Sequence, residues 1–205
     1  MPQVCFENIE KIRDVEFYFW HIEENCDEFS ELIADNGISL AEAQVKFKAT
    51  ARQCEWLATR TLLQQTPYKG QKILYHPNGQ PYLENRHISI SHTRDYVAIA
   101  ISENPIGIDI EHKGRNALAV ANSFLQQQEL DNITAEDALK LWVIKEAAFK
   151  YAPEKAAVLK DIRTVKNNDS YAITYPDGTT AVCLISSIGE ILLSFCVQNL
   201  TSSVE

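Results

Sequence analysis

The sequence predicts an α+β protein built from two similar halves. The chain runs through a strand, a helix and a hairpin, and then goes through the same order again. Its 205 residues are 45% hydrophobic, which is enough for a sizeable core. The dipeptide Asn104-Pro105 is the short joint that we expect between the halves. We therefore predict an N-terminal half over residues 1–104 and a C-terminal half over residues 105–205.

The first half begins with a strand and a long helix. Residues 15–22 are β-branched and aromatic, as is typical of a buried strand. Residues 40–63 are polar with a repeating apolar stripe, which predicts the main helix of this half. Asn-Gly at 78–79 marks a turn, after which residues 87–91 and 96–101 alternate like two paired strands.

The second half repeats this order. We expect a strand at residues 106–111, then helices near 117–127 and 135–151. The Asp-Gly pair at 177–178 predicts a hairpin turn, and the tail at 201–205 is expected to be disordered. The remaining strands are predicted near residues 161–165, 171–175, 180–186 and 191–197.

Charge and cysteine content exclude several classes of protein. A net charge of -9 argues against a broad nucleic-acid surface. The 5 cysteines are odd in number and include no Cys-x-x-Cys pair, so we expect neither a zinc site nor a disulfide framework. The charged N-terminus leaves no uncharged signal core, and no apolar run reaches membrane-spanning length. We expect a cytoplasmic protein that binds neither membrane nor nucleic acid.

The segment Gly-Ile-Asp-Ile-Glu at 107–111 carries the clearest chemical signal. In a strand it points Asp109 and Glu111 to one face while Ile108 and Ile110 pack behind them. Two carboxylates in one small volume repel each other unless a cation lies between them. Hard oxygen ligands suit Mg²⁺ better than zinc, so the sequence predicts a magnesium site here.

A helix over residues 142–150 supplies the other half of this signal. We expect Trp142 and Phe149 to face inward, with Lys145, Glu146 and Lys150 on or near one exposed stripe. Glu146 provides a third carboxylate. The two lysines place positive charge beside the metal site, which suits a polyanion such as a pyrophosphate, so phosphoryl chemistry is our first expectation.

These motifs occur in an order that resembles a known family. Gly-Ile-Asp-Ile-Glu, the later Trp-x-x-Lys-Glu-Ala-x-x-Lys helix and the upstream Ile-Ser-Ile-Ser-His-Thr together are similar to the 4′-phosphopantetheinyl transferases of the surfactin-synthetase-activating type. The match continues in Glu-Trp-Leu-Ala-Thr-Arg at 55–60, Asn-Gly-Gln-Pro-Tyr at 78–82 and Phe-Leu-Gln-Gln-Gln-Glu at 124–129.

The resemblance implies a fold and a reaction. The fold is two α+β halves related by a pseudo-twofold axis, with coenzyme A bound in the cleft between them. The reaction moves the phosphopantetheine arm of coenzyme A onto a serine of an apo acyl or peptidyl carrier protein, as a holo-[acyl-carrier-protein] synthase does, and releases adenosine 3′,5′-bisphosphate. Because the two halves already form the cleft, the resemblance also implies a monomer.

The resemblance also implies roles for individual residues. Asp109, Glu111 and Glu146 match the metal ligands of the family, and Lys150 matches a lysine that contacts the pyrophosphate. Lys145 should help to neutralise the phosphates. Glu146 is our first choice for the general base, although ligation to a metal lowers the proton affinity of a carboxylate.

Further residues are expected to contact coenzyme A. Ser91 and His92 match a pair that contacts its phosphates, and the loop from Tyr75 matches one that touches its adenine and ribose. Gln80 stands where the family usually has lysine, so one positive charge is lost there. Basic residues nearer the N-terminus are expected to compensate. The complete expected set is Lys46, Arg52, Tyr75, His76, Asn78, Gly79, Gln80, Pro81, Ser91, His92, Lys145 and Lys150.

Other prominent residues have simpler interpretations. We expect Trp56 and Trp142 to belong to the core, and Glu129 to be a helix cap or an acid that supports the metal site. Lys113, Arg115 and the helix that begins at Ala117 are the expected docking region for a carrier. Two alternatives stay open: a noncatalytic protein that binds coenzyme A or a carrier, and a Mg²⁺-dependent phosphohydrolase.

Overall fold

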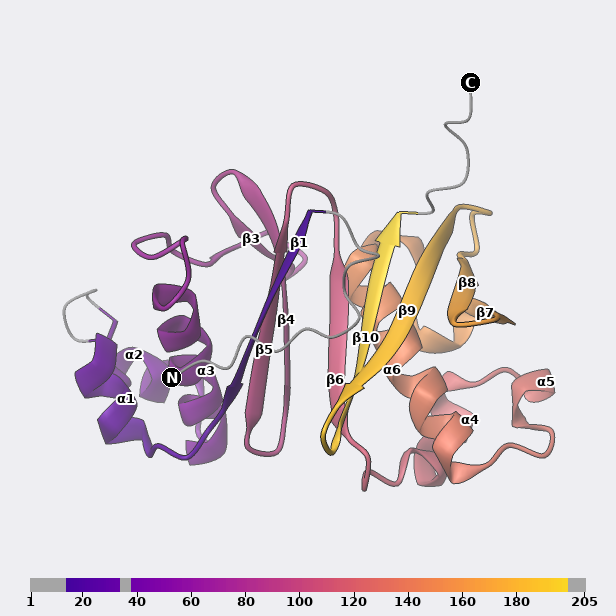
Figure 1. Ribbon diagram of the computed structural model, residues 1–205, viewed down its shortest axis with the longest axis horizontal. Coiled ribbons are helices and arrows are strands. Elements are labelled where there is room, and N and C mark those ends of the chain that lie inside the picture. The colour runs from indigo at the N-terminus through magenta and orange to yellow at the C-terminus, as the bar shows by residue number, and fades with distance from the viewer. Residues whose placement is uncertain (1–13, 34–37, 199–205) are drawn as a thin grey trace.

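Two five-stranded antiparallel sheets lie side by side, each with its helices on the outer face (Figure 1). The computed structural model describes residues 14–33 and 38–198. Strand order is β1-β5-β4-β3-β2 in the first sheet and β6-β10-β9-β8-β7 in the second, so the two halves share one topology. The predicted α+β fold with two similar halves is confirmed. Cys5 and the predicted disordered tail at 201–205 lie outside the described residues.

The first half differs from the prediction mainly in its helices. The single helix expected over residues 40–63 is two helices, because Phe47 is extended and its carbonyl accepts a hydrogen bond from the Gln53 side chain at 2.8 Å. An additional helix was missed, although Asn25 and Glu28 form a recognisable capping pair at its start. The elements are β1 (Val15–His21), α1 (Cys26–Ile33), α2 (Leu40–Lys46), α3 (Thr50–Gln64), β2 (Leu74–Tyr75), β3 (Pro81–Leu83), β4 (Arg86–Thr93) and β5 (Tyr96–Ser102).

In the second half the long helix and all five strands occur where they are expected. The helix predicted over 117–127 is instead a series of short turns, and the last of these starts with a capping box between Gln126 and Glu129. The elements are β6 (Gly107–His112), η3 (Ala117–Val120), α4 (Ala121–Phe124), α5 (Gln127–Leu130), α6 (Ala135–Tyr151), η4 (Pro153–Lys155), η5 (Leu159–Asp161), β7 (Arg163–Asn167), β8 (Ser170–Thr174), β9 (Thr180–Ile188) and β10 (Ile191–Gln198).

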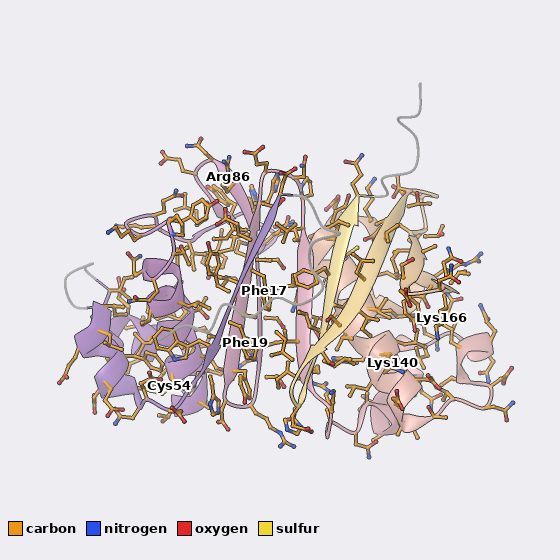
Figure 2. All side chains as sticks on the ribbon, in the orientation of Figure 1. Phe17, Phe19, Cys54, Arg86, Lys140 and Lys166 are labelled. Carbon is orange, nitrogen blue, oxygen red and sulfur yellow. A yellow bond between two sulfur atoms is a disulfide. The ribbon has the colours of Figure 1, made fainter. Side chains whose placement is uncertain are left out.

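A buried apolar layer joins the two sheets. Phe17 and Phe19 on β1 pack with Ile108 and Ile110 of β6 in one core cluster (Figure 2). The rings of Phe17 and Phe195 meet edge to face, with their centroids 5.2 Å apart. This layer confirms that the isoleucines of the Gly-Ile-Asp-Ile-Glu segment pack behind its two acids. None of the described helices is long and apolar enough to cross a bilayer.

A ladder of side-chain hydroxyls also joins the sheets. β6 is an edge strand of the second sheet, so one side of its backbone has no strand partner. The Ile108 N–H donates to Ser89 Oγ at 2.9 Å, and the Ile110 N–H donates to Ser91 Oγ at 3.1 Å. The His112 N–H donates to Thr93 Oγ1 at 3.4 Å. Every second residue of β4 therefore caps the free edge of β6.

One cysteine prediction is wrong. Cys26 at the start of α1 and Cys54 on α3 form a disulfide across 28 residues of sequence, whereas no disulfide was expected. Their separation in sequence gives no hint of pairing, because the packing of α1 against α3 brings them together. Cys183 and Cys196 are buried and free.

Gly107 allows β6 to lie close against α6. A Cβ atom at this position would lie 2.0 Å from the Ala147 carbonyl oxygen and 2.5 Å from the Tyr151 nitrogen, both in the helix backbone. We expect Gly107→Ala to lower the free energy of unfolding by about 3 kcal/mol, because helix and strand must move apart. Chemical denaturation measures this loss.

Gly114→Ala is the matched control. Its Cβ would meet the His112 side chain at 3.1 Å and the end of the Arg94 side chain at 3.8 Å, with no backbone atom among these contacts. We expect a loss below about 1 kcal/mol. Equal losses in the two variants would contradict close strand-helix packing at Gly107.

Candidate active site

Three carboxylates gather where β6 meets α6, and we call Asp109, Glu111 and Glu146 the acidic seam. Asp109 and Glu111 alternate on β6 and are 5% and 6% exposed. Glu146 enters from α6. Asp109 and Glu111 are both close enough to raise the pKa of Glu146. The three predicted metal ligands thus lie close enough to interact electrostatically.

Asp109 is held from both halves of the molecule. Its Oδ1 atom accepts hydrogen bonds from Ser91 Oγ at 2.8 Å and from Lys150 Nζ at 2.7 Å. Its Oδ2 atom is buried and has no hydrogen-bond partner among the described residues. Buried carboxylate oxygens are normally satisfied, so this orphan oxygen marks a place where a cation or donor fits.

Glu111 is held by a hydroxyl, an indole and a guanidinium. Thr93 Oγ1 donates to its Oε2 atom at 2.8 Å, and Trp142 Nε1 donates to its Oε1 atom at 3.1 Å. Arg115 forms an ion pair with the same carboxylate, and its guanidinium carbon lies 4.2 Å from the centre of the Trp142 ring. Trp142 packs against a core cluster, as expected, and its indole nitrogen also reaches the acidic seam.

Burial makes the two glutamates of the seam more basic. Burial raises the pKa of Glu146 above its ordinary value, the charge of Asp109 raises it further, and the nearby cations of Lys150 and Arg115 oppose this. Burial likewise raises the pKa of Glu111. A carboxylate with a raised pKa accepts a proton more readily than an ordinary glutamate.

The donor set of the seam fits a hard divalent cation. It offers carboxylate oxygens alone, and one of them, Asp109 Oδ2, is buried and accepts no hydrogen bond from the part of the chain that the structure describes. Within residues 14–33 and 38–198, no three acidic, histidine or cysteine side chains already converge as a metal cage. Lys150 and Arg115 neutralise Asp109 and Glu111 in this arrangement.

Lys145 does not belong to the seam, and its predicted position on or near an exposed stripe with Lys150 is wrong. The side chain is fully buried and bonds Glu129 at 2.7 Å. At 3.6 residues per turn, Lys145 lies about 140° around α6 from Lys150, so the two lysines cannot share a face. Glu129 also caps α5 and accepts a bond from Thr164 at 2.9 Å, which confirms its predicted capping role.

A cavity of about 350 Å³ lies beside the seam and is lined by both halves. We call it the cross-half cavity. Lys150 lines it and is also bonded to Asp109. Gln80 Nε2 donates to the Lys150 carbonyl oxygen at 3.2 Å, which links the first half to the end of α6. The lining residues are Tyr75, Asn78, Gly79, Gln80, Pro81, Ile88, Ser89, Ile90, His92, Phe149, Lys150 and Pro153.

His76 and Ser91 are among the expected coenzyme A residues that do not line this cavity. His76 does not line it, and its ring stacks on Tyr82 at 4.3 Å between centroids. The Ser91 hydroxyl is buried and donates its hydrogen bond to Asp109. It accepts hydrogen bonds from the Ile110 N–H and from Lys150 Nζ. Ser91 therefore positions Asp109 in this structure.

Basic and aromatic side chains from α2, α3 and β2 cluster in the first half. The Arg60 guanidinium carbon lies 3.5 Å from the centre of the Trp56 ring, and an Arg60 nitrogen donates to the Tyr75 hydroxyl at 3.3 Å. Lys46 Nζ lies 5.5 Å from the centre of the Trp56 ring and 5.6 Å from that of Tyr75. Trp56 packs against the first core, as expected, but it also lines a small cavity beside these cations.

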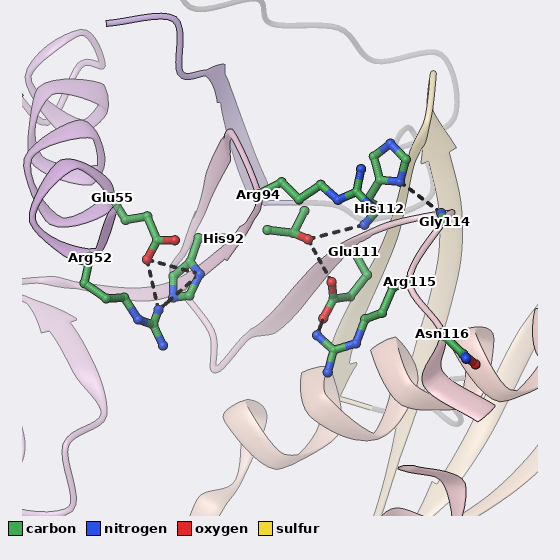
Figure 3. A pocket seen from close by; sticks show the side chains of 10 residues that line it. Arg52, Glu55, His92, Arg94, Glu111, His112, Gly114, Arg115 and Asn116 are labelled. Carbon is green, nitrogen blue, oxygen red and sulfur yellow. Dashed lines mark hydrogen bonds and ion pairs between the residues drawn. The ribbon is translucent and has the colours of Figure 1, made fainter. Parts of the chain in front are cut away.

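His92 and Arg52 meet at the other side of this cluster (Figure 3). Arg52 Nη1 lies 2.5 Å from His92 Nε2 and 2.9 Å from a Glu55 oxygen. Burial lowers the pKa of His92; Glu55 opposes this shift, whereas Arg52 adds to it. The imidazole is therefore held neutral and accepts a bond from the guanidinium.

Sequence reasoning missed two members of this site. Thr93 lies beyond the strand predicted over residues 87–91, yet it continues the alternation of Ser89 and Ser91 by two residues, and that period was a usable signal. Glu55 gave no comparable signal, because only the packing of α3 against the sheet brings it to His92.

The lowered pKa of His92 predicts a pH-dependent stability. The unfolded histidine takes up a proton below its ordinary value of 6.5, whereas the folded one resists protonation. The site thus contributes stability above this value, and the contribution is lost as the pH falls. We expect wild-type protein to lose its stability advantage over His92→Gln between about pH 7.5 and about pH 5.5, as measured by urea unfolding. A constant or growing advantage would contradict this expectation.

Comparison with known sequences finds a family whose pattern is similar to the C-terminal half. Residues 105–196 match the sequence pattern of the 4′-phosphopantetheinyl transferase superfamily. This segment contains β6 and α6, and with them the whole acidic seam and Lys150.

Individual relatives carry the same description. The 4′-phosphopantetheinyl transferase gsp of Aneurinibacillus migulanus is 31% identical over 106 residues, which cover 47% of this chain and 45% of the relative. A 4′-phosphopantetheinyl transferase of Bacillus subtilis is 30% identical over 112 residues, 49% of this chain and 50% of the relative. The Sfp transferase of Bacillus subtilis strain 168 is 29% identical over 106 residues, 47% of each chain.

The chain thus spans about half the length of the curated relatives it matches. The matched segment and the two-sheet fold agree with the resemblance first seen in the motifs. Residues 105–196 of this chain are thus similar to the 4′-phosphopantetheinyl transferase superfamily.

Proposed function

We propose that the protein transfers the phosphopantetheine arm of coenzyme A to a serine hydroxyl of an apo carrier protein. The observation that carries this proposal is the position of Lys150. Its side chain lines the cross-half cavity and also bonds Asp109 of the acidic seam at 2.7 Å. A phosphate in that cavity therefore meets a cation that is directly coupled to the candidate metal ligands.

In this proposal coenzyme A lies along the cross-half cavity. Its pyrophosphate lies at Lys150 and His92, and its nucleotide end reaches toward the loop of Tyr75 and Gly79. Gln80 supplies an amide where a lysine would supply charge. Lys46 and Arg52, on the same side of the first half, are the cations that we propose for the 3′-phosphate.

We further propose that Asp109, Glu111 and Glu146 hold Mg²⁺. When bound, the cation supplies positive charge that stabilises the negative charge developing on the pyrophosphate oxygens. The orphan Asp109 Oδ2 atom supports this assignment, because it is a buried carboxylate oxygen that no described residue satisfies.

Different residues of the chain have different roles in the proposed transfer. The serine oxygen of the carrier forms a bond to the phosphorus that bears the pantetheine, and the bond to the departing adenosine 3′,5′-bisphosphate breaks. Glu146 accepts the serine proton, and its raised pKa favours this role. Lys150 stabilises the charge on the phosphate oxygens.

The remaining features of the proposal concern the setting of the reaction. The carrier docks near Lys113, Arg115 and η3, where Leu118 and Val120 are exposed. We propose a cytoplasmic monomer in which residues 1–104 hold most of the coenzyme and residues 105–205 supply the metal site. A disulfide is unusual in a reducing compartment, so Cys26 and Cys54 are expected to be thiols there.

Intact-protein mass spectrometry of apo carrier proteins tests the proposed transfer. With coenzyme A and Mg²⁺, we expect a carrier to gain roughly 340 Da, the mass of the phosphopantetheine arm. Glu146→Gln should slow this gain by about 1,000-fold, because it removes both a metal ligand and the base. Glu136→Gln is the matched control, since Glu136 is an exposed acid on the same helix that pairs with Lys140.

The other outcomes distinguish the alternatives. Bound coenzyme A without a mass gain on any carrier would contradict transfer and favour a noncatalytic binding protein. Cleavage of coenzyme A without a carrier would favour a phosphohydrolase.

A further inference from the structure

A second cavity, of about 480 Å³, opens beside the acidic seam, and we call it the arginine cavity (Figure 3). Three arginines from three different elements line it: Arg52 from α3, Arg94 from the turn between β4 and β5, and Arg115 from the loop after β6. Glu111 of the seam lines it as well. The cavity is therefore open to the place where the proposed chemistry occurs.

The three arginines are not equivalent. Arg52 is paired with Glu55 at 2.9 Å, and Arg115 is paired with Glu111. Arg94 is exposed and has neither a hydrogen bond nor an ion pair with any described residue. It is the cation of this cavity that is available to a ligand.

The backbone of Arg94 is also unusual. Its φ angle is +41°, in the left-handed region that glycine and asparagine adopt far more readily than arginine. The tight turn between β4 and β5 would therefore form more easily with glycine. An arginine that strains its turn and makes no hydrogen bond or ion pair with a described residue points to a role toward a partner.

We propose that Arg94 binds a carboxylate of the carrier protein, on the segment that presents the acceptor serine. This inference rests on the proposed transfer and names the contact that aligns its protein substrate. A guanidinium matches a carboxylate through two parallel hydrogen bonds. Arg94 is a positioning residue, because the bound carboxylate fixes the segment while Glu146 and Lys150 act on the reacting atoms.

Charge complementarity favours an acidic protein segment at this cavity. The chain has a net charge of -9, so an acidic partner is repelled by most of its surface. The arginine cavity is an exception, with three guanidinium groups against the two carboxylates of Glu55 and Glu111. Local attraction on a repelling background selects one docking orientation.

The nucleotide already has its own cations. Lys150 lines the cross-half cavity, whereas Arg94 does not. His92 lies between the two cavities and lines both of them. Coenzyme A and the carrier thus approach the seam from two cavities that share one residue.

Steady-state kinetics of Arg94→Gly test the proposal with an apo carrier that the wild-type protein modifies. We expect the KM for the carrier to rise about 10-fold, with kcat and the KM for coenzyme A within about twofold of wild type. The carrier KM of Arg94→Lys should lie between those of wild type and Arg94→Gly, because lysine keeps the positive charge but cannot form two parallel hydrogen bonds to a carboxylate. Arg94→Glu should raise the carrier KM further through repulsion.

Salt dependence and stability separate docking from a structural role. The carrier KM of the wild type should rise with NaCl more steeply than that of Arg94→Gly. Because glycine relieves the strain in the turn, the thermal unfolding midpoint of Arg94→Gly should be no lower than that of wild type. Lys166→Ala is the matched control: Lys166 is an exposed cation on β7 whose loss should leave every parameter unchanged (Figure 2).

Each remaining outcome contradicts either the proposed role of Arg94 or the proposed transfer. An unchanged carrier KM in Arg94→Gly overturns the proposal, and so does a rise confined to the KM for coenzyme A, which would assign Arg94 to the nucleotide. If the wild type modifies no carrier, the proposed function fails first. Fluorescence anisotropy of a labelled apo carrier then still compares wild type with Arg94→Gly, and equal or absent binding overturns the inference as well.

Discussion

The free edge of β6 is the constraint on which the rest of the structure depends. Its outward N–H groups have no strand partner, and buried N–H groups must be satisfied. β4 lies inside its own sheet, so its backbone is already paired and only its side chains can reach β6. The hydroxyls of Ser89, Ser91 and Thr93 supply the missing acceptors. Two of these hydroxyls, those of Ser91 and Thr93, in turn donate hydrogen bonds to Asp109 and Glu111. The bonds that join the halves and the bonds that hold the acids are therefore the same network.

This arrangement explains how a protein can hold three like charges at one place, two of them buried and the third half-buried. A buried carboxylate is costly unless it is paired and hydrogen-bonded. Asp109 and Glu111 receive a hydroxyl from the first half and a cation from the second, namely Lys150 and Arg115. Glu146 has less support, and burial raises its pKa. Such perturbed acids beside a cavity are characteristic of sites that do chemistry, and the proposed transfer uses this one as its base.

Much of this site could be predicted from local pattern, and the failures have physical causes. Alternation with a period of two placed both acids of β6 on one face, because strand geometry depends only on neighbours in sequence. Lys145 was misplaced because proximity in sequence was taken for proximity on a helix face, and its neutralisation by Glu129 is a tertiary contact. The helix break near Phe47 depends on a side-chain bond from Gln53, and the pairing of Cys26 with Cys54 depends on helix packing. Neither has a local signature.

The most direct measurement compares Ser89→Ala with Ser91→Ala, through the free energy of unfolding and the transfer rate at saturating coenzyme A. Each variant leaves one buried N–H of β6 without an acceptor, so both should lose about 1 to 3 kcal/mol of stability. Only Ser91 also bonds Asp109 and Lys150. We therefore predict that kcat falls at least about 10-fold in Ser91→Ala and stays within about twofold of wild type in Ser89→Ala. Unchanged stability in both variants, or equal losses of kcat, would contradict the claim that one hydroxyl ladder holds both the fold and the site.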